Sequence, residues 1–108
     1  MKQITFETDF NNKLGCENFV HIALAPPRPV SEGELVEPIQ VTVADNKNFK
    51  STVRIVDLLR LPLSNLLNIH TLPSHGKYCN VFIEDFLTKN PNATLETPMA
   101  VYYYQIVR

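Results

Sequence analysis

The chain has 108 residues, a length typical of one folded domain, so we expect a single domain over residues 1–108 with one hydrophobic core. Hydrophobic residues make up 44% and charged residues 19% of the sequence, a composition that excludes an intrinsically disordered chain. The 10 basic and 11 acidic residues give a formal net charge of -1. The molecule as a whole therefore does not attract phosphate, and contact with a nucleic acid requires a local basic patch.

The N-terminal segment is polar and acidic where a secretory signal is continuously apolar, and no stretch is long enough to cross a membrane. We therefore expect a cytoplasmic protein with no membrane partner. Cys16 and Cys79 are far apart, and their spacing matches no zinc motif. The sequence thus predicts free, buried thiols, no metal site and no cofactor.

The first half of the chain predicts strands separated by a short helix and a loop. Residues 3–7 alternate in polarity and predict a strand, and residues 9–15 predict a short helix with Asp9 as its N-cap and Gly15 just past its end. A second strand begins near Phe19 and must stop at Pro26. Residues 25–34 predict a surface loop, and residues 39–43 and 52–55 predict a hairpin around the turn residues 45–48.

The second half predicts one longer helix and a final strand. Residues 58–67 are rich in leucine, and those after Pro62 predict a helical turn, followed by a turn-rich segment at residues 70–76. Apolar residues at spacings of three and four from Lys77 predict an amphipathic helix that Pro91 must end. Residues 99–107 are aromatic and β-branched, as in a central strand. The fold class is therefore α+β, with about five to six strands in a mixed, partly open barrel.

Segments along nearly the whole chain carry a resemblance to a known family. They are Ile4-Thr5-Phe6, Leu14-Gly15, Gly33-Glu34, Pro62-Leu63-Ser64-Asn65-Leu66, Asn90-Pro91 and Val101-Tyr102-Tyr103-Tyr104-Gln105-Ile106. In this order they resemble the ASCH domain, a relative of the PUA RNA-binding domains. Within the family, the chain is similar to small bacterial enzymes that act as acetylcytidine amidohydrolases. The resemblance implies a PUA-like barrel.

The chain departs from the family at its motif. ASCH proteins carry a Gly-x-Lys-x-x-Thr-x-Arg-type motif at the turn into the second strand, and in the amidohydrolases its Lys and Thr join a Glu near the long helix to cleave an amide. This chain can be aligned with the motif in two ways. One places Asn18, His21 and Ala23 at the Lys, Thr and Arg positions, and the other places Glu17, Val20 and Ile22 there. Residues 72–77 contain no Glu. The family's chemistry is therefore not predicted here, and the chain is not expected to be an enzyme of that type.

The resemblance also implies a ligand pocket beside the second strand. The residues of this chain that we expect to contribute to ligand binding there are Glu17, Asn18, His21, His75 and Lys77. His21 and His75 are the candidates for a catalytic base, although a single histidine on a strand is more often structural.

Four basic residues lie on or beside the predicted hairpin, and with nearby aromatic residues they outline a surface for single-stranded RNA. They are Lys47, Lys50, Arg54 and Arg60. Acidic residues alternate with them, however, which is typical of an ordinary solvated face. Residues 102–104 are three consecutive tyrosines that either stack on bases or pack in the core.

Three functions remain open. The first is an ASCH-like module that binds RNA, a nucleoside or a similar small ligand without the family's amidohydrolase chemistry. The second is an amidohydrolase with a rewired site, in which His21 or His75 acts as the base on an acetylated nucleoside. The third is a protein-interaction module on a PUA-like scaffold, which the near-neutral charge also fits.

Overall fold

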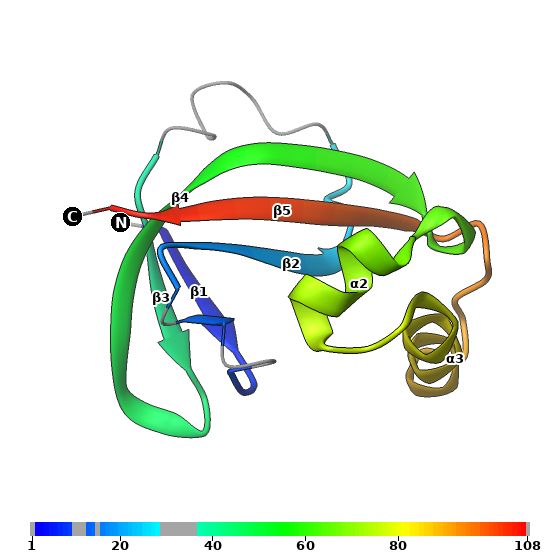
Figure 1. Ribbon diagram of the computed structural model, residues 1–108, viewed down its shortest axis with the longest axis horizontal. Coiled ribbons are helices and arrows are strands. Elements are labelled where there is room, and N and C mark those ends of the chain that lie inside the picture. Colours follow the sequence, from blue (N-terminus) through cyan, green and yellow to red (C-terminus); the bar gives the residue numbers. More distant parts are fainter. Residues whose placement is uncertain (1, 10–12, 15, 29–36, 108) are drawn as a thin grey trace.

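The structure is a computed structural model that describes residues 2–9, 13–14, 16–28 and 37–107 (Figure 1). The described part is an α+β fold with one mixed five-stranded sheet, as the sequence predicts. In chain order the elements are β1 (Lys2–Phe6), β2 (Asn18–Leu24), β3 (Ile39–Val43), β4 (Asn46–Pro62), the 3-10 turn η2 (Leu63–Asn65), α2 (Asn68–His75), α3 (Cys79–Lys89) and β5 (Pro98–Ile106).

The strand order in the sheet is β1-β3-β4-β5-β2. β1 pairs with β3 in parallel, and the other neighbours are antiparallel. β4 is 17 residues long and bends strongly, so that its first half pairs with β3 and its second half with β5 (Figure 1). Its register shifts between Ile55 and Asp57, and such an irregularity increases the local bend of a strand. The resulting curled sheet is compatible with a partly open barrel.

The two faces of β5 bury different clusters of side chains. Tyr104 belongs to a cluster inside the curl of the sheet with Phe6, Phe19 and Val53, whereas Val101 belongs to a second cluster on the opposite face. The second cluster is completed by residues of η2 and α3, which lie at one end of the sheet (Figure 1). Alternation along the strand explains this division, because successive side chains point to opposite faces.

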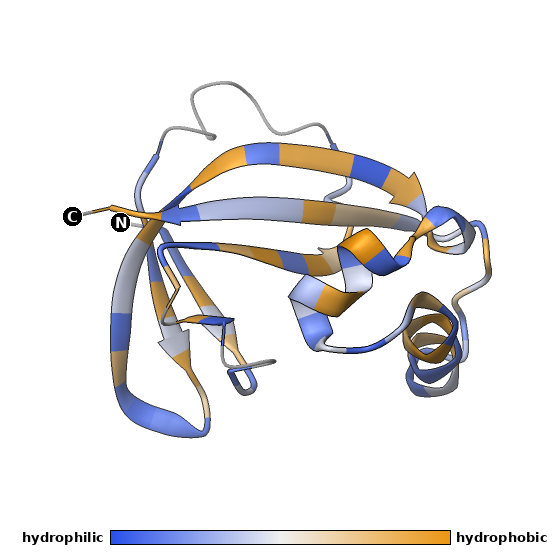
Figure 2. Ribbon diagram, viewed as in Figure 1, coloured by the Kyte–Doolittle hydropathy of each residue, from blue (hydrophilic) through white to orange (hydrophobic). Residues whose placement is uncertain are grey.

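Helix α3 confirms the predicted amphipathic helix. Its residues Phe82, Ile83 and Phe86 recur at helical spacing and pack into the second cluster. Figure 2 shows hydrophobic and hydrophilic stretches along the same helix. The helix ends at Lys89 because Pro91, close behind it, has no backbone N–H to continue the hydrogen-bond pattern.

Helix α2 corrects the prediction of a turn-rich segment at residues 70–76. These residues form most of an eight-residue helix, with Pro73 inside it. Gly76 ends the helix in the left-handed conformation, with φ of 70°, and its N–H donates to the carbonyl oxygen of Leu72 at 2.8 Å. The proline and glycine suggested a turn, but α2 is stabilised by packing against β2 and α3.

Other boundaries also differ from the predictions. The leucine-rich segment is strand β4 as far as Pro62, and the predicted helical turn is confirmed only after it, as η2. The predicted helix at residues 9–15 and the loop at residues 25–34 lie partly outside the described residues. Within the described part, the Asp9 carboxylate accepts a hydrogen bond from the backbone N–H of Leu14 at 3.0 Å. The hairpin, the second strand and the final strand are confirmed.

Candidate functional site

A chain of buried polar groups lies where α2 packs against β2. The Lys13 side chain is only 5% exposed, and its Nζ donates to the carbonyl oxygen of Ser74 at 2.6 Å and lies 2.8 Å from Nδ1 of His21. Ser74 is fully buried, and its Oγ accepts the backbone N–H of Ile22 at 2.8 Å and lies 2.7 Å from Nδ1 of His75. Residues far apart in the sequence therefore meet in one polar cluster, which we call the Lys13 cluster (Lys13, His21, Ser74 and His75).

The position of β2 at the end of the sheet explains part of this arrangement. An edge strand has backbone N–H groups that no neighbouring strand accepts. In β2, the N–H of Ile22 donates to the hydroxyl oxygen of Ser74 instead. Alternation along β2 turns His21 to the face of Phe6, whose ring centroid lies 4.4 Å from the imidazole centroid. His75, the last residue of α2, lies 5.1 Å from His21 between ring centroids.

Burial decides the protonation of Lys13. The loss of water around its ammonium lowers its pKa to about 7, and the negative charge of Asp9 opposes this shift. The Lys13 amine therefore loses its proton near neutral pH, whereas lysines in water are almost entirely protonated there.

Burial also keeps the histidines of the cluster neutral. Burial lowers the pKa of His21 the most, and together with the positive charges of Lys13 and His75 it brings this pKa to about 2. Burial is also the main cause of the low pKa of His75, which falls to about 4 with smaller contributions from the positive charges of Lys13, Lys77 and Lys89. When Lys13 is protonated it can only donate, so Nδ1 of His21 accepts the hydrogen bond and the ring proton is on Nε2.

A cavity of about 510 Å³ opens beside the Lys13 cluster. This volume is within the range of about 300–1,000 Å³ that small-molecule sites occupy. We call it the large cavity. Most of its lining is apolar or aromatic, and it is formed by Lys13, Cys16, Asn18, Phe19, Val20, Val56, Pro73, Tyr103 and Tyr104.

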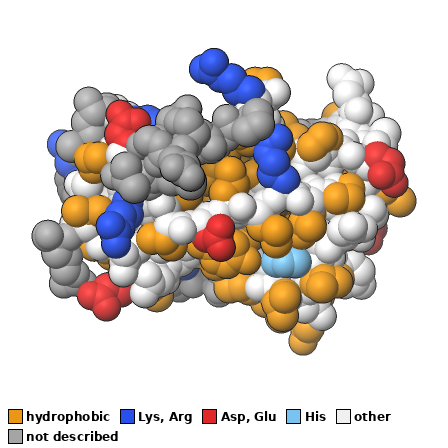
Figure 3. Space-filling model, turned by 90° about the horizontal axis from the view of Figure 1, so that it is seen from above, with side chains coloured by type: hydrophobic (Ala, Val, Ile, Leu, Met, Phe, Trp, Pro, Cys, Tyr) orange, Lys and Arg blue, Asp and Glu red, His pale blue; other side chains and the backbone are white. Residues whose placement is uncertain are grey.

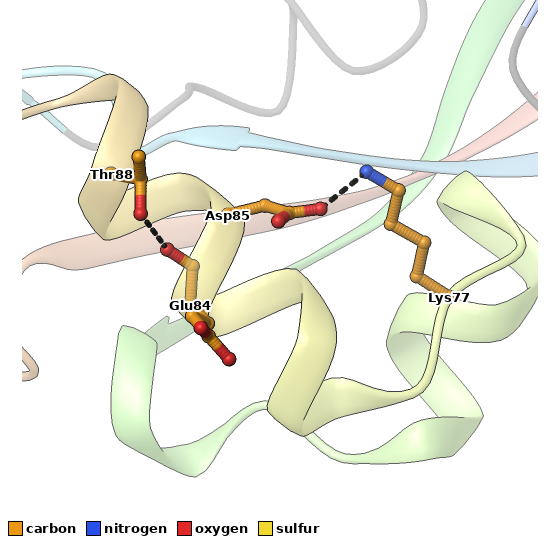
Figure 4. Close-up of polar contacts among 4 residues, drawn as sticks. All are labelled: Lys77, Glu84, Asp85 and Thr88. Carbon is orange, nitrogen blue, oxygen red and sulfur yellow. Dashed lines mark hydrogen bonds and ion pairs between the residues drawn. The ribbon is translucent and has the colours of Figure 1, made fainter.

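A second cavity, of about 180 Å³, lies between β2, the end of α2 and α3, and we call it the small cavity. His75, Lys77, Asp85 and Lys89 contribute to its lining. Nζ of Lys77 pairs with Oδ2 of Asp85 at 2.7 Å, and both side chains are more than a third exposed (Figure 4). The hydrogen bond of this carboxylate to Lys77 holds the pKa of Asp85 below its usual value.

The structure divides the predicted ligand residues between these places. Asn18 lines the large cavity, His75 and Lys77 line the small cavity, and His21 lies in the Lys13 cluster. Glu17 is exposed and its carbonyl oxygen accepts the N–H of Ile106 at 2.8 Å. The predicted residues therefore do not converge on one cavity.

The four predicted RNA-binding residues do not form one strip. Lys47 and Lys50 are exposed near the start of β4, but the register shift in this strand places Arg54 opposite Gln105 and Arg60 opposite Ala100, on different faces. Arg54 donates to the side-chain oxygen of Gln105 at 2.8 Å, and Arg60 donates to the carbonyl oxygens of Pro26 and Arg28. The face seen in Figure 3 shows basic side chains at several places among hydrophobic, acidic and other polar side chains.

Tyr102 and Tyr104 share one face of β5, and their ring centroids are 5.8 Å apart. Tyr104 is buried, and its ring also stacks on that of Phe19 at 5.0 Å. Burial raises the pKa of both phenols. Tyr103 lies on the other face and lines the large cavity together with Tyr104. These tyrosines thus serve mainly in packing and in the cavity wall.

Sequence reasoning missed Lys13 and Ser74, two central residues of the cluster. Lys13 stands in a polar segment where a lysine is expected to be solvated, and Ser74 stands between a proline and a glycine in the segment predicted as turns. Both are buried only because α2 covers β2. The expectation of buried thiols was also wrong, since Cys16 is exposed ahead of β2 and Cys79 is half-buried at the start of α3.

Within the ranges that the structure describes, no three His, Cys, Asp or Glu side chains are placed to hold a metal ion. In the same ranges no helix is long and apolar enough to cross a membrane.

Neither a protein-family model nor a curated protein matches this sequence. A solved structure does resemble it, that of protein EF3133 from Enterococcus faecalis V583, described by the family-model DUF984. The two share 4% sequence identity with a TM-score of 0.65, and the match covers 99% of this chain and 81% of the other. At this identity the likeness shows a common fold alone.

Proposed function

We propose that this protein is an ASCH-like module on a PUA-like barrel, and that its large cavity binds a planar ligand of nucleoside size. The observation that carries the proposal is the lining of this cavity. Its volume of about 510 Å³ suits a small organic molecule, and the rings of Phe19, Tyr103 and Tyr104 contribute to its wall.

The polar residues of the cavity suit a heterocycle. The side-chain amide of Asn18 has both a hydrogen-bond donor and an acceptor. These groups complement the acceptor and donor groups on the edge of a nucleobase. Aromatic side chains stack on any base because every base has a π face. Few charges line the cavity, which favours a neutral nucleoside over a phosphorylated one.

A free nucleoside also fits the structure better than a long RNA strand. Affinity for RNA depends mainly on phosphate contacts, and the arginines proposed for this role already bond within the protein. Arg54 and Arg60 also lie on different faces of β4. We therefore expect binding that changes little with salt concentration.

The pKa of Lys13 favours amide hydrolysis in the same cavity as a second candidate function. A general base works best when its pKa is near the working pH, and Lys13 has a pKa of about 7. His21 and His75, with pKa values of about 2 and about 4, take up protons too weakly for that role. Release of acetate from acetylcytidine, lost in Lys13→Met, would support this second candidate over simple binding.

Binding is tested by calorimetric titration with the four common ribonucleosides and with a short RNA oligomer. We expect micromolar to millimolar affinity for at least one nucleoside and a loss of about tenfold in Asn18→Ala, because one hydrogen bond is removed. Asn48→Ala is the matched control, since Asn48 is exposed on β4 and lies outside the cavity lining. The proposal is wrong if the folded protein binds no nucleoside, or if Asn18→Ala binds as the wild type does.

A further inference from the structure

Lys13 lines the large cavity, and no carboxylate among the described residues forms an ion pair with its amine. Among the residues that the structure describes, the one ion pair within 4.0 Å is that of Lys77 and Asp85, on the other side of the Lys13 cluster. The groups within hydrogen-bonding distance of the Lys13 amine are the carbonyl oxygen of Ser74 and the imidazole of His21, both uncharged, and the centroid of the Phe6 ring lies 5.9 Å from Nζ. The negative charge of Asp9 and the Phe6 ring favour the ammonium ion, but the loss of water around the amine outweighs them and favours the neutral form.

The two contacts also set the orientation of the neutral amine. Such an amine has two N–H bonds and one lone pair. The Ser74 oxygen, at 2.6 Å, and Nδ1 of His21, at 2.8 Å, accept both N–H groups when the imidazole carries its proton on Nε2. The lone pair is then the part of the amine left for an incoming group. A desolvated lysine in an apolar pocket is the kind of amine that acts as a nucleophile toward carbonyl compounds.

We propose that Lys13 is a carbonyl-reactive lysine and that the large cavity takes a neutral aldehyde or ketone, which becomes bound to Nζ as a Schiff base. This inference goes beyond nucleoside binding, which needs Lys13 only as part of the wall, and beyond amide hydrolysis, in which Lys13 would act as a base and not as a nucleophile. The apolar lining suits an uncharged carbonyl compound.

The reaction is balanced without an oxidant or a reductant. The lone pair of Nζ forms a bond to the carbonyl carbon while one amine proton passes to the carbonyl oxygen, which gives a carbinolamine. The carbon–oxygen bond then breaks, and the hydroxyl group leaves with the remaining amine proton as water. One amine and one carbonyl group thus give one imine and one water molecule.

The test uses the full chain, benzaldehyde as the probe and sodium cyanoborohydride to trap the imine at pH 7, with peptide mapping by mass spectrometry over time. At this pH the neutral fraction of an amine with a pKa of about 7 exceeds that of an ordinary lysine by about a thousandfold. Since a weaker base is also a weaker nucleophile, we expect Lys13 to react at least about tenfold faster than the exposed Lys47 and Lys50. Peptide mapping also separates the N-terminal amine from these sites.

A variant that blocks the cavity gives an independent test. Val56 is 49% exposed and lines the large cavity, so Val56→Trp should fill the cavity mouth without removing a contact of Lys13. We expect this variant to lose at least about fivefold in the labelling rate at Lys13, with no change at Lys47. Circular dichroism checks that each sample is folded.

The inference is overturned if Lys13 in the folded wild type is labelled no faster than Lys47. It is also overturned if Val56→Trp leaves the rate at Lys13 unchanged. Neither result bears on nucleoside binding, which is measured by calorimetry without aldehyde or reductant, so the two proposals fail separately.

Discussion

Acidification from pH 7.5 to 5.5 should destabilise the fold through its buried histidines. The pKa values of His21 and His75 are lowered to about 2 and about 4, below the value of about 6.5 that histidine has in an unfolded chain. Between these pH values the unfolded chain binds protons that the folded state does not. The free energy of unfolding therefore falls as the pH falls through 6.5.

The size of the effect follows from the same values. Over this range a histidine that stays neutral in the fold contributes about 1.4 kcal/mol. His21 should contribute nearly all of this, and His75 less, because it is more accessible to water. We expect a combined loss of about 2 kcal/mol, a large part of the roughly 5–15 kcal/mol that stabilises a typical domain. Lys13 adds to the loss, because its folded pKa of about 7 is also below its unfolded value.

Urea denaturation followed by circular dichroism at pH 7.5, 6.5 and 5.5 measures this dependence. His21→Gln keeps a side-chain oxygen that can accept the hydrogen bond of Lys13 but cannot titrate, so it should lose about half of the pH dependence. Equal free energies of unfolding at pH 7.5 and 5.5 would refute the reasoning. An unchanged pH dependence in His21→Gln would refute the role of that residue.

Further substitutions test single contacts by urea denaturation at pH 7.5. Ser74→Ala should lower the free energy of unfolding by about 2–4 kcal/mol, because the N–H of Ile22 and Nδ1 of His75 both lose the Ser74 hydroxyl as their partner. The control Ser64→Ala, at an exposed serine, should change it little, and equal effects of the two substitutions would contradict this reasoning. Gly76→Ala should cost about 1–2 kcal/mol, because alanine disfavours a φ of 70°, and no loss would contradict the helix end. Lys77→Ala should leave the denaturation midpoint unchanged, because its ion pair is exposed, and a clear shift would show a larger role.

The strands could be predicted well because their side chains alternate between core and solvent. Ile39, Val41 and Val43 are buried while Gln40 and Thr42 between them are half-buried, and this pattern is visible in the sequence. Helix α2 could not be predicted, because its local signals are those of turns. Its helical form depends on contacts with β2 and α3, which no local pattern encodes.

The candidate site was predicted in part for the same reason. Alternation along β2 correctly separated His21 from Val20 and Ile22, which belong to the opposite cluster. The burial of Lys13 depends on α2, which contacts its amine through Ser74, a residue 61 positions away in the chain. The local sequence therefore indicated which side chains lie on the same face of a strand, but not which of them are buried by a distant segment.

The energetic cost of Lys13 is itself an argument for a function. Holding this amine neutral at pH 7 costs about 5 kcal/mol, because an exposed lysine has a pKa of 10.5 whereas that of Lys13 is about 7. A methionine of similar length would fill the space without that cost, although it would lose the hydrogen bonds to Ser74 and His21. Those bonds between neutral groups recover only about 1 kcal/mol each. The fold therefore sacrifices stability to keep an amine at the cavity wall, which is the pattern expected of a residue that acts on a ligand.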